Sequence, residues 1–284
     1  MLHYKKTEIH GHRGCRGYFP ENTLQGFLHA ATLDIDAIEM DVVISKDHEV
    51  VVSHELYMHR KKCLWPNLKP ISKEQEPSLM LYQMNYEEIK TFDCGLLTHP
   101  NYPLVKASPA YKPLLKEVIE KVELAILKFG KQPLKYNIEI KSEAQLIGKC
   151  QPAYDVYVDL ILQVLVKMDI ESRVIIQSFD KEMLKTINKM NPNIELSLLI
   201  EDQLDPLQHI EELGFIPHIL ASDFIYLNTN NILSLQNKNI KVFAFTVNQI
   251  ADIETQIAMG VDAIITDYPD VAARCLNYYK YPEK

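Results

Sequence analysis

The chain has 284 residues, of which 47% are apolar and 24% charged, a composition typical of a globular protein that excludes disordered, collagen-like and coiled-coil chains. Its 30 Lys and Arg residues against 38 Asp and Glu residues give a net charge of −8, which argues against a nucleic-acid or anionic-membrane surface. No stretch holds about 18 consecutive apolar residues, so we expect no integral membrane segment.

Nine short apolar runs, rich in β-branched residues, predict strands along the chain. Their near-continuous apolar character is expected when both faces of a sheet are buried. They cover Glu8–Gly11, Ala37–Ile44, Val50–His54, Tyr136–Lys141, Arg173–Ser178, Glu195–Ile200, Ile219–Phe224, Lys241–Val247 and Ala263–Thr266.

Helical patterns lie between many of these runs, and five are marked by start or stop signals. The first is capped by Asn22, and the second opens at Pro113 and ends before Gly130. The others are Pro152–Met168, a helix capped by Asp180 and stopped by Asn191 and Pro192, and Gln249–Met259, which ends at Gly260.

Alternating strands and helices predict an α/β fold with a parallel sheet. At this length the expected closed form is a TIM-type (β/α)8 barrel. Nine runs compete for eight barrel positions. Only five residues separate Ile44 from Val50, too few for a crossover helix. Either one run of that pair is a hairpin partner, or one of the later strand predictions is wrong.

The stretch from Glu55 to Tyr111 interrupts the alternation. It is rich in proline and carries a short helical signal at Tyr86–Phe92. It follows the run that ends at His54, so we expect residues 55–111 to cap the carboxyl ends of the strands, where TIM-type barrels keep their active sites. We interpret the whole chain, residues 1–284, as a single catalytic domain that contains this insertion.

Acidic residues stand at the ends of two predicted strands. Glu39 and Asp41 share one strand face because side chains alternate, and Glu139 lies near the end of another strand. The intervening Met40 and Ile140 are apolar and should pack outward against helices. Three carboxylates pointing into one barrel mouth would repel one another, and a hard divalent cation with oxygen ligands would relieve that repulsion.

Basic residues accompany these acids. Arg13 and Lys141 would supply fixed positive charge, and His12 and His54 could act as acid and base. Such a site suits an anionic phosphate ester. Each pattern alone has an ordinary explanation, such as a sheet-edge ion pair or a surface histidine. The prediction therefore depends on all four elements ending at the same barrel rim.

The five cysteines are scattered, odd in number and without a C-x-x-C pair, so they predict free thiols in a reducing compartment. The start, MLHYKKTEIHGH, has basic residues but no apolar run after them, so no signal peptide is expected. We therefore expect a cytoplasmic protein, although a trimmed secreted or periplasmic form would have the same sequence pattern.

Several motifs together resemble the glycerophosphodiester phosphodiesterase family. Residues 11–27, GHRGCRGYFPENTLQGF, resemble its opening HRG and PENT signature, and residues 36–55 resemble its E-x-D, K-D and terminal histidine segment. Later signatures follow in the same order: NIEIK at 137–141, QSF at 177–179, FTVN at 245–248 and GVDAIITDYPD at 260–270.

The resemblance implies a TIM-type barrel with an insertion after the third strand motif, and roles for the residues that match. It implies that one Mg²⁺ or Ca²⁺ ion is bound by Glu39, Asp41 and Glu139. The implied acid/base pair is His12 and His54, and the implied phosphate- or glycerol-binding groups are Arg13, Lys141 and Phe245. The chain departs from the family pattern at His48, where Gly is usual, at Phe245, where Trp is frequent, and at Glu55, which replaces Asp.

The reaction implied is hydrolysis of a small-molecule glycerophosphodiester to glycerol 3-phosphate and an alcohol. The glycerol 2-hydroxyl would attack phosphorus to give a cyclic phosphate, which water then opens. Two alternatives stay open: a lysophospholipase D-type esterase that uses the same centre, and a non-catalytic phosphodiester-binding barrel. The sequence indicates no oligomeric state.

Overall fold

The computed structural model describes residues 6–280, with side chains described as far as residue 277. The first five residues, which contribute to the prediction about a signal peptide, lie outside this range. Eight parallel strands close into a barrel, because β1 pairs in parallel with both β2 and β9. These strands are β1 (Glu8–Gly11), β2 (Ala37–Ile44), β4 (Lys135–Ile140), β5 (Val174–Ser178), β6 (Glu195–Ile200), β7 (Ile219–Asp223), β8 (Lys241–Phe245) and β9 (Ala263–Thr266). The predicted TIM-type barrel is confirmed.

The ninth predicted run is not a barrel strand. It forms β3 (Val50–Val52), which pairs antiparallel with β2 through the registers Val42↔Val52 and Ile44↔Val50. The hairpin explanation of the extra run is therefore confirmed. The strand ends two residues before His54, earlier than predicted.

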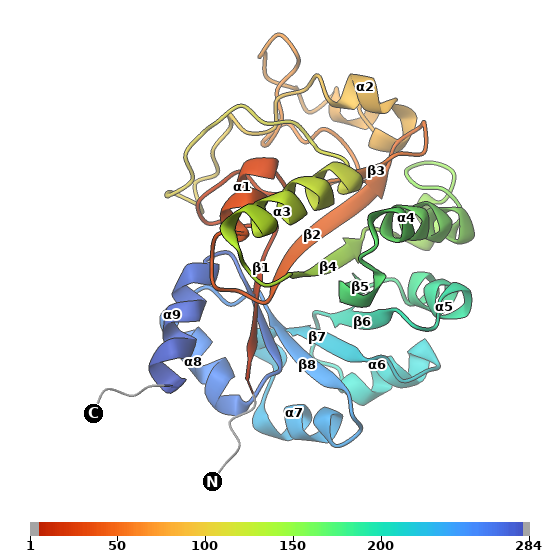
Figure 1. Cartoon of the computed structure of the whole chain (residues 1–284). Helices are drawn as coiled ribbons and strands as arrows, with labels where there is room; N and C mark the ends of the chain where they lie inside the picture. Colours follow the sequence, from red (N-terminus) through yellow and green to blue (C-terminus); the bar gives the residue numbers. More distant parts are fainter. Residues whose placement is uncertain (1–5, 281–284) are drawn as a thin grey trace.

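Helices surround the barrel (Figure 1). They are α1 (Leu24–Ala30), α3 (Leu115–Phe129), α4 (Tyr154–Met168), α5 (Lys181–Met190), α6 (Pro206–Leu213), α7 (Thr229–Gln236), α8 (Ile250–Met259) and α9 (Pro269–Lys280). The five predicted helices are present, whereas α6, α7 and α9 were not predicted. Among the described residues, no helix is both long and apolar enough to span a membrane.

The predicted cap of α1 is wrong. Thr23, in extended conformation, caps the helix by accepting a hydrogen bond from Gly26 N, and Asn22 precedes it with a left-handed φ of 56°. A capping residue normally needs extended backbone, which Asn22 lacks. Its side-chain amide donates instead to Asp41 Oδ2 at 2.8 Å, so Asn22 belongs to the barrel mouth.

The main core lies between the strands and the surrounding helices. Met40 and Ile140 pack in it with Val118 and Ile119 of α3, as predicted from their place between polar neighbours. A smaller apolar cluster that includes Ile175, Leu199 and Phe243 is formed by alternate strand residues. Outward packing of the intervening residues turns Glu39, Asp41 and Glu139 toward the inside of the barrel.

The segment between β3 and α3 holds the short helices η1 (Glu76–Ser78), η2 (Leu81–Gln83) and α2 (Tyr86–Ile89). It has a hydrophobic cluster of its own, in which Met58, Ile89 and Phe92 pack with Val43 and Val51 of the β2–β3 hairpin. In Figure 1 this orange-to-yellow segment stands at the top of the view, near β3 and α1. The insertion is thus anchored on the hairpin that leaves the barrel.

Candidate active site

Three carboxylates meet inside the barrel mouth, two from the first half and middle of β2 and one from the end of β4. Asp41 and Glu139 are direct partners in the parallel register, and Glu39 lies two residues before Asp41 on the same face. All three side chains are buried, and one oxygen atom of each lies within 4.8 Å of the others. The structure therefore brings together the three acids that the sequence singled out.

The three carboxyl groups differ in charge state because their neighbours differ. Burial and the charges of Asp41 and Glu139 raise the pKa of Glu39 well above its ordinary value. Burial, reinforced by Asp41 and opposed by Lys141, raises the pKa of Glu139 to about 7. Burial would also raise the pKa of Asp41, but Lys141 and Arg13 outweigh it and hold that pKa well below its usual range.

The cluster has the donor chemistry of a hard divalent cation. All its donors are carboxylate oxygens, which Mg²⁺ and Ca²⁺ prefer. Asp41 Oδ1 is buried and accepts no hydrogen bond in the structure, although Lys141 Nζ lies 3.0 Å away. A buried oxygen without a hydrogen-bond donor, beside two acids whose pKa values are raised, fits a position where a cation would bind.

Two positive side chains border the carboxylates. Lys141 Nζ donates to Glu139, and Arg13 Nε lies 3.2 Å from Asp41 Oδ2. Arg13 Nη1 also donates to Glu21 at 3.1 Å. The backbone of Arg13 is left-handed, with φ of 48°, and its N–H donates to Glu39 Oε2 at 2.8 Å. Arg13 thus holds one acid through its backbone and faces another with its guanidinium.

His12 is held by a carboxylate that the sequence analysis did not assign. Its Nδ1 lies 2.8 Å from Asp267 Oδ1 and must be the donor because an ionised carboxylate only accepts. Its Nε2 lies 3.9 Å from Glu39 Oε2. Burial and the guanidinium of Arg16 lower the pKa of His12 to about 4, although Asp267 opposes them. A neutral imidazole therefore presents its unprotonated Nε2 toward the acids.

Asp267 is itself firmly placed. Arg16 donates to both of its oxygens, at 2.7 and 3.0 Å, and Asn248 donates to Oδ2 at 2.8 Å. Burial would raise its pKa, but His12 and Arg16 hold the pKa of Asp267 well below its usual range. Asp267 therefore stays charged and fixes the ring orientation of His12.

His54 follows β3 and lies at the edge of the same site. Its Nδ1 lies 3.2 Å from Glu55 Oε1, and Lys62 Nζ donates to that same oxygen. His54 borders a cleft of about 560 Å³ together with Glu139 and Lys141. The departure at Glu55 therefore acquires a structural role, because this carboxylate links the histidine to the insertion.

Phe245 lies at the end of β8 and is partly buried. Its ring meets that of Phe179 edge-on, with centroids 6.2 Å apart, and Phe179 lines the cleft that His54 and Lys141 border. Phe245 thus pairs with a second ring, Phe179, which the sequence analysis did not single out.

A chain of polar side chains continues from the acids into the barrel. Gln177 donates to Glu39 Oε1 at 3.2 Å and accepts from Asn137 at 3.2 Å. The Asn137 amide also lies 3.4 Å from His10 Nδ1. Two amide side chains, Asn137 and Gln177, therefore stand between His10 and Glu39 in this chain of contacts. Gln177 and Asn137 lie within the NIEIK and QSF motifs, so motif membership was the available signal for them.

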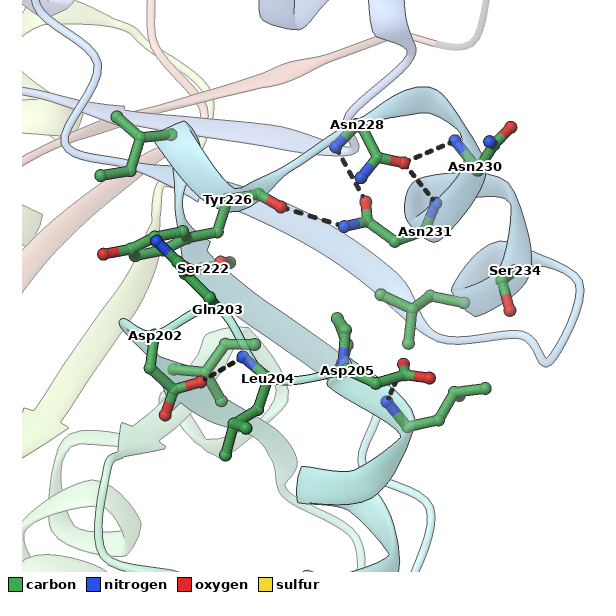
Figure 2. A pocket seen from close by; sticks show the side chains of 15 residues that line it. Asp202, Gln203, Leu204, Asp205, Ser222, Tyr226, Asn228, Asn230, Asn231 and Ser234 are labelled. Atoms are coloured by element: carbon green, nitrogen blue, oxygen red, sulfur yellow. Dashed lines mark hydrogen bonds between the residues drawn. The ribbon is translucent and has the colours of Figure 1, made fainter.

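A larger cleft, of about 900 Å³, lies between the loops after β6 and β7 (Figure 2). Its polar side chains serve as helix caps and turns: Asp205 accepts from Leu207 N, and Asn228 accepts from Asn230 N and Asn231 N. Its described lining contains no Lys, Arg or His. Without a cationic side chain in that lining, this cleft is poorly suited to phosphate chemistry.

The chain matches the sequence profile of the Glycerophosphoryl diester phosphodiesterase family over residues 12–271. It is 30% identical over 273 residues to a glycerophosphodiester phosphodiesterase of Bacillus altitudinis, a match that covers 94% of this chain and 97% of that protein. It is 28% identical over 265 residues to a glycerophosphodiester phosphodiesterase of Caldanaerobacter subterraneus, covering 93% and 96% respectively.

Solved structures share the fold. A crystal structure from Silicibacter pomeroyi superposes with a TM-score of 0.86 at 24% identity, covering 98% of this chain and 95% of that one. A phosphodiesterase of Oleispira antarctica, whose structure holds the product sn-glycerol-3-phosphate, gives a TM-score of 0.74 at 22% identity, covering 95% and 96%. At these identities the similarity bears on the fold alone.

Proposed function

The chain belongs to the glycerophosphoryl diester phosphodiesterase family, and we propose that it hydrolyses small-molecule glycerophosphodiesters to glycerol 3-phosphate and an alcohol. The observation that carries this proposal is the meeting of Glu39, Asp41 and Glu139 within 4.8 Å, with His12 and His54 on elements that reach the same rim. The set combines ligands for one cation with an acid/base pair.

We assign the three carboxylates as ligands of one Mg²⁺ or Ca²⁺ ion. When bound, the cation would polarise the phosphate and lower the pKa of a nearby hydroxyl. The two cationic side chains, Arg13 and Lys141, would bind the non-bridging phosphate oxygens, Arg13 by its planar fork and Lys141 as a point charge. Phe245, with Phe179 beside it, would form the wall against which the glycerol carbons pack.

The two histidines would transfer the protons of the reaction. We propose that His12 and His54 act as a pair: one removes the proton of the glycerol 2-hydroxyl, which attacks phosphorus, and the other protonates the leaving alcohol. The attack is intramolecular, so it is favoured entropically. Water then opens the cyclic phosphate, and the two histidines exchange roles. Asp267 contacts Nδ1 of His12, and Glu55 contacts Nδ1 of His54, so both Nε2 atoms are free for this transfer.

A coupled assay for glycerol 3-phosphate tests the proposal. We expect product from glycerophosphocholine and glycerophosphoethanolamine, loss of activity with a chelator, and recovery with Mg²⁺ or Ca²⁺. His12→Ala and His54→Ala should each lose on the order of 10²–10⁴-fold in kcat, whereas His48→Gly, in an exposed turn, should keep wild-type turnover. A chelator-insensitive enzyme, or near wild-type turnover in either alanine variant, would refute these assignments.

A second candidate, lysophospholipase D activity, is favoured by one feature of the cleft beside His54. Leu56, Leu146 and Phe179 line it, so it offers apolar surface to an acyl chain. Comparing kcat/KM for lysophosphatidylcholine and glycerophosphocholine distinguishes the two. A ratio in favour of the lysolipid that falls in Leu146→Ser would support this candidate, and preference for glycerophosphocholine would reject it.

A further inference from the structure

Two cysteines of the insertion lie side by side. The sulfur atoms of Cys63 and Cys94 are 2.6 Å apart, although the residues are 31 positions apart in the chain and neither is in a disulfide. Cys63 is fully buried and Cys94 is partly buried in the cluster that contains Phe92 and Trp65. The sequence predicted scattered, unpaired thiols, and the fold of the insertion brings these two together.

Their backbones have the register of a cross-strand pair. Leu64 and Asp93 form an antiparallel bridge, with Leu64 N donating to Asp93 O at 2.7 Å. In an antiparallel pair, the residue before one bridge member lies opposite the residue after the other. Cys63, which precedes Leu64, therefore lies directly opposite Cys94, which follows Asp93. Directly opposed residues have Cα atoms about 4.5–5.5 Å apart, within the span that a disulfide bridges.

We propose that Cys63 and Cys94 are a redox-active pair that forms an intramolecular disulfide, with a low-molecular-mass disulfide as the oxidant. The bond would tie the segment after His59 to the segment after Phe92, two parts of the insertion that the chain joins only through 31 residues. This inference is independent of the reaction proposed for the barrel.

The groups around Cys63 favour its reaction as a thiolate. The thiol of Cys94 donates a hydrogen bond to Cys63, and with the nearby ammonium of Lys112 it lowers the pKa of Cys63 despite burial. Lys112 is buried and donates to Ser53 Oγ at 2.8 Å, so its charge is fixed in place. Cys94 lines a cleft of about 190 Å³ together with Lys62, which gives a small oxidant a route to its sulfur.

Two exchange steps account for all atoms and electrons. Burial raises the pKa of Cys94 well above its usual range, so its sulfur gives up its proton as it attacks the small disulfide. The leaving sulfur takes that proton, and one thiol is released as the mixed disulfide forms. The thiolate of Cys63 then attacks the Cys94 sulfur and releases the second thiol. Two protein S–H bonds and one external S–S bond become one protein S–S bond and two external S–H bonds, so the oxidant gains two electrons.

The pair adjoins a contact that reaches the barrel mouth. Lys62, the residue before Cys63, donates to Glu21 at 2.6 Å and to Glu55, the carboxylate that binds His54. A disulfide at the neighbouring position would therefore fix the loop that carries Lys62. Oxidation thereby stabilises the insertion at its attachment to the barrel.

Peptide mapping of the folded full chain tests the proposal. The protein is incubated with oxidised glutathione, alkylated, digested with trypsin without reduction, and analysed by mass spectrometry. We expect a linked species joining peptides 63–73 and 91–106, which dithiothreitol separates. The melting temperature should rise on the order of 5 °C on oxidation, because a long loop is closed, and should return on reduction.

Matched variants locate the effect. Cys63→Ala, which suits the buried position, should lose both the linked peptides and the rise in melting temperature. Cys275→Ala, on α9, should keep both. The proposal is overturned by either of two results in the folded wild-type protein: glutathione adducts without linked peptides, or cross-links that join Cys63 or Cys94 to another cysteine.

Discussion

Replacing Glu139 by Gln should stabilise the metal-free protein at alkaline pH. Burial is the main cause that raises the pKa of Glu139 from 4.5 to about 7. Each pH unit corresponds to about 1.4 kcal/mol, so ionising this carboxyl in the folded protein costs about 3 kcal/mol. Because Gln cannot ionise, the variant avoids this cost and keeps an oxygen to accept from Lys141.

The direction in which stability changes with pH follows from proton binding. Between pH 4.5 and about 7 the folded protein holds a proton on Glu139 that the unfolded chain has released, so the free energy of unfolding falls as pH rises. The cost is absent below pH 4.5 and complete above pH 7. The stability advantage of Glu139→Gln should therefore appear only above about pH 5 and reach about 3 kcal/mol at about pH 8.

Urea unfolding in the presence of a chelator, at pH 4.5 and at about pH 8, measures this difference. Glu120→Gln, the same chemical change on an exposed position of α3, is the matched control and should leave the pH profile unchanged. Added Mg²⁺ should reverse the order at pH 8, because the wild type gains ligand-binding free energy that the variant loses. Equal pH profiles for wild type and Glu139→Gln would show that Glu139 is not electrostatically strained, and the reasoning would fail.

Asp267→Asn should lower kcat on the order of 10²–10⁴-fold while Mg²⁺ still raises the melting temperature, because His12 loses the partner that fixes its tautomer; unchanged kcat would remove Asp267 from the site. Phe245→Ala should raise KM more than it lowers kcat in the glycerol 3-phosphate assay, and the opposite pattern would contradict a wall that binds glycerol. His48→Gly should stabilise the protein by about 0.5–1 kcal/mol in urea, because His48 has φ of 63°, where Gly carries no Cβ strain; destabilisation would show that the histidine side chain contributes there.

Period-two alternation, combined with the predicted parallel barrel, was sufficient to predict that the three acids meet. Because Met40 and Ile140 are apolar, the residues on either side had to face the barrel interior, and parallel register then placed Asp41 opposite Glu139. The same reasoning could not find Asp267. Its contact with His12 joins residues 255 positions apart and exists only because β9 closes the barrel against β1. Closure is a property of the whole sheet that no local pattern encodes.

Two of the unpredicted helices did have local signals. Helix α6 begins with the cap Asp205, has Pro206 in its first turn and ends at Gly214 in left-handed conformation, and α7 begins with a capping box at Asn228. Both are only eight residues long, so their apolar periodicity spans about two turns and is weak. Cap chemistry would have been the better guide there. At Asn22 it misled, because the side chain bonds Asp41 instead of its own helix.

The hairpin that the sequence analysis left open, and not a barrel strand, determines the place of His54. As a parallel strand, the run Val50–His54 would end at the rim, but β3 runs the other way. β2 continues beyond its last pairing with β4, at Val42, and β3 folds back along it until Ser53 N donates to Asp41 O at 2.9 Å. His54 follows at once. The hairpin therefore returns the chain to the carboxylates from outside the barrel, and the insertion begins within contact of the site. A barrel strand could place only its own end residue at the rim. The hairpin places His54 there, and the next residue, Glu55, connects that histidine to the insertion.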